Sequence, residues 1–171
     1  PQPGQLNELI QAVDKSCREV RAISHQLLPP AFGEENFDTI LQQLVCGLQL
    51  NQDCQISLDI SDRSILNDIQ TDRQVEIFRI TQEAVHNAFK HAAPSHISIM
   101  FSVFEKELSV LIEDNGKGFC LENTGDGIGL RNMKDRAKHL SGRLSIDSHP
   151  ERGTVVHVEV PLAKHHQSTN S

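Results

Sequence analysis

The stretch that decides the fold is residues 71–92, which read T-D-R-Q-V-E-I-F-R-I-T-Q-E-A-V-H-N-A-F-K-H-A. Thr71 followed by Gln74 matches a capping box, so we expect a helix to begin here. At about 100° per residue, the apolar positions gather on one side of this helix: Ile77, Ile80, Ala84, Val85, Ala88 and Phe89. The opposite side carries polar residues: Glu76, Arg79, Glu83, Asn87 and Lys90. The pattern predicts an amphipathic helix packed on a core.

Three residues on the polar side have a chemistry that a plain surface helix does not need. Glu83, Asn87 and Lys90 follow one another at intervals of about one helical turn. An acid, an amide and a base in one stripe can serve an attacking group, a metal and a phosphate. In a plainer interpretation, Glu83 only pairs with Arg79 or Lys90 along the helix. The helix alone leaves both interpretations open.

The segments around this helix predict strands and further helices. Residues 37–50 have a helical pattern, and residues 55–60 alternate as a strand does. After a break at residues 92–94, two alternating runs flank a turn at residues 105–106. These runs predict a hairpin with one buried face, formed by Ile97, Ile99, Phe101, Val103, Leu108, Val110 and Ile112.

The last third of the chain repeats this alternation. Residues 130–140 predict a helix, and residues 144–148 with residues 154–160 predict a second hairpin. Only one helix separates the two hairpins, so the strands can join one mixed sheet. We therefore expect an α+β fold, an α/β sandwich with helices on one face of a mixed sheet.

A D-x-G-x-G motif at Asp114, Gly116 and Gly118 directly follows a predicted strand. A carboxylate at a strand end can accept a hydrogen bond from the exocyclic amine of a purine, and the two glycines allow a flat ring to lie against bare backbone. Taken alone the motif is weak, because Asp114 could simply cap a turn.

A G-x-G-L motif at Gly127, Gly129 and Leu130 opens the next predicted helix. Unpaired N–H groups at a helix start can bind phosphate. The preceding polar, glycine-rich residues 123–127 predict a mobile loop. Neither a P-loop nor a G-x-G-x-x-G dinucleotide fingerprint occurs in the sequence.

Composition narrows the class of protein. With 171 residues, we expect one domain with a small appendage. The net charge of -7 and the lack of a basic cluster argue against nucleic acid as a partner. The four scattered cysteines predict free thiols in a reducing compartment. No long apolar run or export leader is present, so the segment is expected to be soluble and to make no membrane contact.

The two ends of the chain carry separate expectations. Apolar residues in residues 1–30 recur at spacings of three and four, as in a helix that packs on another helix, and a double proline ends the pattern. An intermolecular bundle and a helix folded back on its own domain are both compatible with this pattern. His25 lies in this helix, where a surface role is favoured over a reactive one. The polar residues 164–171 predict a disordered tail.

Taken in order, the motifs resemble those of the Bergerat-fold ATPases. These motifs are E-x-x-x-N-x-x-K-H, D-x-G-x-G, G-x-G-L and a closing R-G-T-V-V hairpin. Within that superfamily, I-F-R-I-T-Q-E-A-V-H-N-A-F-K-H-A, E-D-N-G-K-G-F and G-I-G-L-R-N-M-K-D-R-A are similar to the sensor histidine kinases that pair with NarL-type response regulators. S-H-Q-L-L-P-P resembles the end of their second dimerisation helix. The resemblance covers residues 13–162 and implies a partial dimerisation helix at residues 1–30 and an ATP-binding catalytic domain at residues 31–163.

The resemblance implies roles for the polar face of the central helix. Glu83 would orient or activate the attacking group as the catalytic residue. Asn87 would bind the Mg²⁺ that bridges the phosphates of ATP. Lys90 and His91 would meet phosphate oxygens.

The same resemblance implies an adenine site. Asp114 would accept a hydrogen bond from the adenine amine, Gly116 and Gly118 would lie beneath the ring, and Thr154 would lie near it. The cofactor-binding set is completed by the G-x-G-L residues, whose glycines would form the phosphate-side hinge of a lid: Gly127, Gly129 and Leu130.

The implied activity is transfer of the γ-phosphoryl group of ATP to a histidine. The family's acceptor motif, a histidine followed by an acid, is absent here, because His25 is followed by Gln26. The acceptor would therefore lie on another helix of the same kinase, which would be a homodimer that serves a response regulator. The resemblance implies a cytoplasmic domain and leaves open whether its parent protein is anchored in a membrane.

Two other functions are compatible with these motifs. One is a different Bergerat-fold ATPase, such as an anti-sigma-factor serine kinase, against which the stalk-like first helix argues. The other is a non-catalytic nucleotide-binding interaction module, against which the intact Glu83, Asn87 and Asp114 argue.

Overall fold

The computed structural model describes residues 31–49, 54–120 and 127–162. The chain divides into two compact units, Pro1–Ala31 and Phe32–Ser171. The expected dimerisation helix with His25, most of the expected mobile loop and the expected tail lie outside the described residues.

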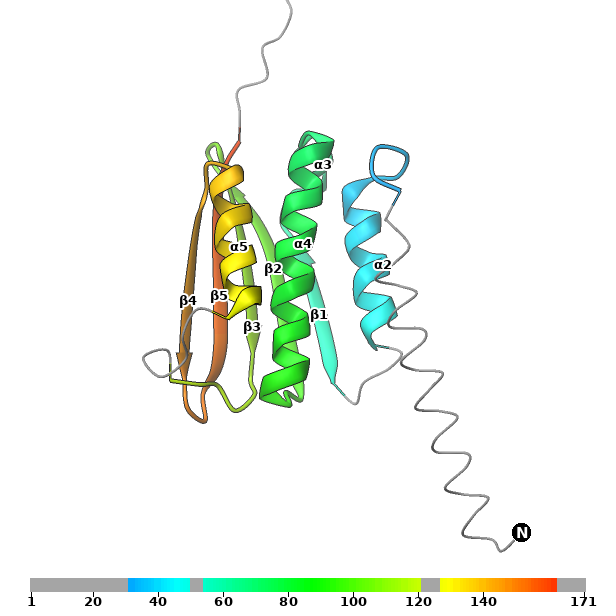
Figure 1. Cartoon of the computed structure of the whole chain (residues 1–171). Coiled ribbons are helices and arrows are strands. Elements are labelled where there is room, and N and C mark those ends of the chain that lie inside the picture. Colours follow the sequence, from blue (N-terminus) through cyan, green and yellow to red (C-terminus); the bar gives the residue numbers. More distant parts are fainter. Residues whose placement is uncertain (1–30, 50–53, 121–126, 163–171) are drawn as a thin grey trace, which may run out of the picture. The chain divides into compact units, whose positions relative to one another are not determined.

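Five strands form one mixed sheet in the order β1-β2-β3-β5-β4 (Figure 1). The strands are β1 Gln55–Ile60, β2 His96–Phe104, β3 Glu107–Asp114, β4 Arg143–His149 and β5 Gly153–Pro161. β1 pairs with β2 in parallel, and the other three pairings are antiparallel. Both predicted hairpins are present, and each strand of the second is one residue longer at both ends than expected, because the backbone pairing continues beyond the alternating residues.

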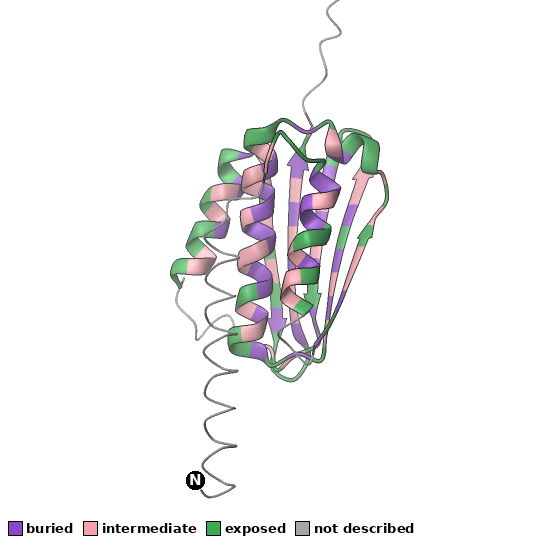
Figure 2. Ribbon diagram, turned by 90° about the vertical axis from the view of Figure 1, so that its right-hand side faces the viewer, coloured by how far each residue is buried: buried purple, intermediate pink, exposed green. Residues whose placement is uncertain are grey.

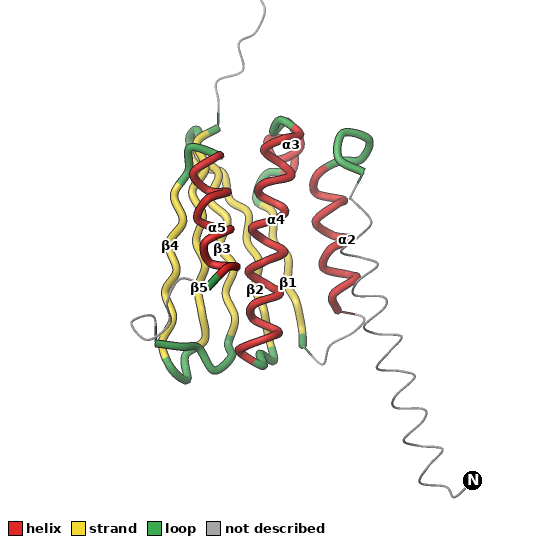
Figure 3. The backbone as a smooth tube through the Cα atoms, viewed as in Figure 1, coloured by secondary structure: helices red, strands yellow, loops and turns green. Residues whose placement is uncertain are grey.

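The helices lie on one face of this sheet, as expected (Figures 1 and 3). They are α2 Phe37–Gln49, α3 Arg63–Asn67, α4 Thr71–Asn87, the π-helix η1 Ala88–Ala92 and α5 Ile128–His139. The short helix α3 was not predicted, and α5 begins two residues earlier than expected. Together with the sheet order, this arrangement confirms the α+β sandwich.

The core lies between the helices and the sheet. The predicted alternation in β2 and β3 is confirmed, because Ile97, Ile99, Leu108, Val110 and Ile112 are buried. The apolar side of α4 faces the same layer, and Figure 2 shows buried residues along the strands and on the sides of the helices toward them. The strand face away from the helices carries mostly polar and small side chains.

The capping-box prediction is wrong. Gln70 is the N-cap of α4 and makes no side-chain capping bond, and Thr71 is the first residue of the helix. The Gln74 amide is buried and donates to the carbonyl of Ile69 at 2.8 Å. The Gln74 side chain therefore binds a carbonyl of the preceding loop and does not form the reciprocal hydrogen bond of a capping box.

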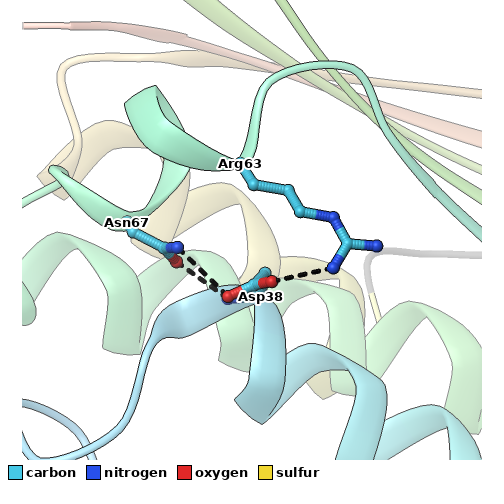
Figure 4. Close-up of polar contacts among 3 residues, drawn as sticks. All are labelled: Asp38, Arg63 and Asn67. Carbon is cyan, nitrogen blue, oxygen red and sulfur yellow. Dashed lines mark hydrogen bonds and ion pairs between the residues drawn. The ribbon is translucent and has the colours of Figure 1, made fainter.

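A polar cluster centred on the buried Asp38 joins the first helices of the domain (Figure 4). The Asp38 carboxylate accepts hydrogen bonds from Asn67 Nδ2 and from Arg63 Nη1, both at 3.1 Å. The Asp38 N–H in turn donates to Asn67 Oδ1 at 3.0 Å. This reciprocal pairing fixes the start of α2 to α3, because a buried carboxylate is stable only when its oxygens are satisfied.

No helix among the described residues has both the length and the apolar character needed to cross a membrane.

Candidate functional site

A cavity of ≈ 710 Å³ opens where α4 and η1 meet the start of α5 and the neighbouring ends of the strands. The residue expected to be catalytic, Glu83, lines it, and so do all but one of the residues expected to bind ATP: Asn87, Lys90, His91, Asp114, Gly118, Gly127, Gly129, Leu130 and Thr154. The exception is Gly116. Residues far apart in the sequence thus meet around one space, although their roles stay predictions.

The polar face of α4 forms one wall of this cavity. Glu83 and Asn87 are half-buried and lie one turn apart. Both approach Gly129, where an added Cβ would meet the Glu83 carboxylate and would lie 3.3 Å from Asn87 Nδ2. In the described part of the chain Arg79 donates to Gln82 at 2.8 Å, and Glu83 forms no ion pair with Arg79 or Lys90. The plainer interpretation of Glu83 as a helix-surface ion pair therefore has no support in the structure.

The end of α4 changes into the π-helix η1, which carries Lys90 and His91. Both side chains are exposed at the mouth of the cavity. The residue that follows η1, Ala93, takes the left-handed conformation with φ 47° and ψ 54°. Single π-turns within helices are rare and occur frequently at functional sites. The break predicted at residues 92–94 is present, but the π-turn had no signal in the apolar pattern.

Asp114 is a buried carboxylate at the end of β3, facing Thr154 on β5. Gly116 N–H donates to Asp114 Oδ1 at 2.8 Å, and the Thr154 hydroxyl and backbone also bond to the carboxylate. Burial raises the pKa of Asp114 above its usual range, although these hydrogen bonds oppose the shift. A hydrogen-bond donor that enters the cavity would therefore stabilise the ionised form of this buried carboxylate.

The two glycines of the D-x-G-x-G motif are required for packing. A Cβ at Gly116 would collide with Ala92 at the end of η1. Gly118 has φ +58°, and its Cβ would collide with the carbonyl of His149. Gly116 therefore fits the loop against η1 rather than lining the cavity, while Gly118 forms part of the lining.

Apolar side chains form the inner wall of the cavity: Ile112, Met133, Ile146 and Val156. They come from the sheet face toward the helices and from α5; Ile112 was predicted as core, and the other three were not assigned to a site. An apolar wall beside a buried carboxylate suits a flat heterocycle that carries an amine.

His86, Ile128 and Asn132 are among the other lining residues that sequence reasoning did not assign to the site. His86 is next to Asn87, and this position on α4 was the only feature of the sequence that could have indicated its place in the lining. Ile128 is 82 % exposed although it is large and apolar. A second, smaller hollow of ≈ 360 Å³ lies at the opposite end of β3 around Phe104 and contains none of the motif residues.

The described residues contain no group of three or more His, Cys, Asp or Glu side chains that could hold a metal ion by themselves. Mg²⁺ in nucleotide enzymes usually takes few protein ligands and several phosphate and water oxygens. The single amide oxygen of Asn87 fits such a site. Among the described residues, Cys46 and Cys54 are free thiols, as expected.

Residues 72–164 match the family model described as histidine kinase-, DNA gyrase B- and HSP90-like ATPase. The chain belongs to this family.

The ATPase domain is also similar to curated sensor kinases over nearly its whole length. It is 30% identical to the sensor protein VraS of Staphylococcus saprophyticus over 165 residues, which are 96% of this chain and 46% of that protein. It is 29% identical to the sensor histidine kinase LiaS of Bacillus subtilis over 153 residues, which are 89% of this chain and 41% of that protein. The chain thus spans about half the length of these relatives.

Solved structures agree on the fold of the ATPase domain. The histidine kinase AdeS of Acinetobacter baumannii aligns with a TM-score of 0.63 at 15% identity, over 96% of this chain and 87% of that one. The kinase domain of a blue-light activated histidine kinase of Erythrobacter litoralis aligns with a TM-score of 0.60 at 20% identity, over 74% and 59%. At these identities the likeness shows that the chain shares the fold of these histidine kinase structures.

Proposed function

We propose that this domain transfers the γ-phosphoryl group of ATP to a histidine outside the chain, as part of a two-component sensor kinase that pairs with a NarL-type response regulator. The observation that carries the proposal is the single cavity, which has a buried carboxylate against an apolar wall at one end and Glu83 with Asn87 at the other. Adenine and the reacting phosphate need these two environments at the same time.

The adenine end uses Asp114 as the acceptor for the exocyclic amine. Its carboxylate is buried and already held by Gly116 N–H and Thr154, so its orientation is fixed before the nucleotide binds. Ser148 supports Thr154, with 2.9 Å between their hydroxyl oxygens, and accepts from Phe119 N–H at 2.9 Å. A fixed acceptor selects for a donor at that position of the purine.

The phosphate end is formed by α4, η1 and the first turn of α5. Lys90 and His91 would contact phosphate oxygens, and N–H groups at the start of α5 would bind them as helix N-termini do. Asn87 would hold Mg²⁺, which neutralises phosphate charge when it is bound. Glu83 is an anion beside a polyanion, so it is suited to orienting the attacking histidine rather than to binding ATP.

The similarity to sensor kinases extends to nearly the whole chain, beyond the residues of the family match. This favours the sensor-kinase assignment over another ATPase of the family, and it supports a partial dimerisation helix at residues 1–30. The implied partners are the acceptor helix, a second copy of the full protein and a response regulator. We propose that the domain lies in the cytoplasm, because its proposed substrate ATP is found there.

The nucleotide assignment is tested by calorimetry with Mg-ATP and Mg-GTP. ATP is expected to bind and GTP to bind poorly, because the six-position oxygen of guanine cannot donate to Asp114. Asp114→Asn is expected to weaken ATP by about 1–3 kcal/mol, the cost of an impaired buried polar pairing. Equal affinity of the wild-type chain for ATP and GTP would refute the assignment of Asp114.

The role of Glu83 is tested by single-turnover transfer at saturating ATP to a protein carrying the first dimerisation helix. Glu83→Gln keeps the shape of the side chain and removes its charge. It is expected to leave ATP affinity near normal and to slow transfer about 10²–10⁴-fold, the usual contribution of a general base. An unchanged rate would mean that Glu83 is only a surface charge.

A further inference from the structure

Asn115 directly follows the adenine-side aspartate, and none of the roles above uses it. Its side chain makes three hydrogen bonds to the start of β2. Oδ1 accepts from the N–H groups of Ser95 at 3.0 Å and His96 at 2.9 Å, and Nδ2 donates to Ser95 Oγ at 2.9 Å. The Asn115 N–H also donates to the carbonyl of His96 at 3.2 Å. The residue after Asp114 is thus fixed to residues 95–96.

The segment that Asn115 holds continues directly from the phosphate-side helix. The π-helix η1 ends at Ala92, and Ala93 reverses the chain in the left-handed region. That conformation is unfavourable for a residue with a Cβ and persists only where neighbouring contacts hold it. Ser95 lies two residues after Ala93, and most of the contacts that hold it are hydrogen bonds to the Asn115 side chain.

The loop after Asp114 also holds the other side of this reversal. Lys117 N–H donates to the carbonyl of Ala92 at 2.9 Å. Gly116 packs so closely on Ala92 that a Cβ would not fit. The D-x-G-x-G loop therefore contacts the chain on both sides of Ala93, at Ala92 and at residues 95–96.

We propose that Asn115 is a positioning residue for nucleotide binding, which joins the adenine side of the cavity to its phosphate side. By holding residues 95–96, it fixes the distance between Asp114 and the π-helix that carries Lys90. One nucleotide can reach both ends only at that distance. This role rests on the proposed nucleotide-binding function of Asp114 and Lys90.

The physical effect of Asn115 is preorganisation of the binding site. Asn115 is exposed, so water can replace its hydrogen bonds when the side chain is removed, and the fold is expected to lose little stability. The loop becomes more mobile, however, and ATP must then order it on binding. Ordering costs reduce affinity without removing any contact to the ligand.

The test measures the affinities of the full chain for Mg-ATP and Mg-GTP, together with its melting temperature. Asn115→Ala is expected to raise the Kd for ATP about 3–10-fold, the scale of ordering one mobile segment. The preference for ATP over GTP should fall as well, because GTP does not use Asp114. Asn115→Asp should restore the affinity for ATP to within about twofold of wild type, because a carboxylate accepts both N–H groups and the Ser95 hydroxyl can donate to it.

Asn67 provides a matched control. It makes a comparable set of amide hydrogen bonds with Asp38, and it does not line the cavity. Asn67→Ala is expected to lower the melting temperature and to leave the ATP-to-GTP preference unchanged. An unchanged preference in Asn115→Ala, or no rescue by Asn115→Asp, would overturn the positioning role. Failure of the wild-type chain to bind ATP would instead refute the proposed function and this role with it.

Discussion

Asp114 is a carboxylate whose surroundings disfavour its charge until a ligand arrives. Its pKa is raised chiefly by burial, and to a lesser extent by the neighbouring Glu113. In the role proposed for Asp114, the adenine amine needs the ionised form as its acceptor. The same residue therefore connects the pH dependence of nucleotide binding with the pH dependence of folding.

The affinity for ATP is expected to fall as the pH drops through the raised pKa of Asp114, above the usual carboxylate range near about 4. The stability effect has the opposite sign. Between the unfolded pKa and the raised folded pKa, the native state binds more protons, so stability falls as the pH rises and the loss persists at neutral pH. Asp114→Asn should flatten both curves, as measured by calorimetry and by denaturant unfolding at several pH values. An unchanged acid-side fall in ATP affinity would assign the titration to another group.

Most residues of the cavity lining that carry polar chemistry could be predicted one by one, because several weak motifs, D-x-G-x-G among them, occur together in one order. Asn115 could not be found in this way, since an asparagine before a glycine is common in any turn. Its partners Ser95 and His96 lie about twenty residues away in sequence, so its contacts exist only in the folded structure. The apolar wall was missed because core and binding wall share one pattern.

At the scale of elements, α4 and α5 are held together over much of their length. Arg136 on α5 forms an ion pair with Glu76 on α4 at 2.8 Å. Arg73, near the start of α4, donates to the carbonyls of Leu140 at 3.2 Å and Pro161 at 2.7 Å. These contacts fix the C-terminal half of α5, so the position of its first turn depends on Gly127 and Gly129.

The two glycines of this turn are expected to differ in their sensitivity to substitution. Gly129→Ala would push the Glu83 carboxylate aside, because the added methyl group has no other space. Transfer should therefore slow at least tenfold, while nucleotide affinity changes less. The methyl group added in Gly127→Ala meets no atom within 4 Å, and the backbone N–H is kept. The transfer rate should therefore fall less than in Gly129→Ala. Single-turnover transfer rates of Gly129→Ala and Gly127→Ala, measured side by side, test this difference. Equal rates would show that Gly129 does not position Glu83.

Element types were largely predicted from the period of the apolar residues, but element ends were not. The N-terminus of α4 differs from the expected capping box because Gln74 is used by the preceding loop. The five residues of α3 are too few to show a helical period. A change from α- to π-geometry at Ala88 leaves the buried stripe almost unchanged, so the apolar pattern of the sequence does not indicate it.

At the scale of the whole molecule, this chain contains a nucleotide site but no recognised acceptor. Mixed with labelled ATP alone, it is expected to accumulate no acid-labile phosphate. It should transfer phosphate only to an added protein that carries the first dimerisation helix. A denaturing gel with acid and alkali treatment distinguishes phosphohistidine from other products. Phosphorylation of His25 in the isolated chain would contradict the assignment of residues 1–30.

The sheet order has a consequence for the sequence of folding events. β2 with β3 and β4 with β5 are hairpins of low contact order, and they can form early. β3 pairs with β5 across residues 115–152, which include α5 and β4, and it is this pairing that brings Thr154 opposite Asp114. The adenine side of the cavity therefore does not exist until the two hairpins have docked. A nucleotide that binds only the docked state shifts the equilibrium toward it by mass action, so ATP is expected to stabilise the product of this late assembly step.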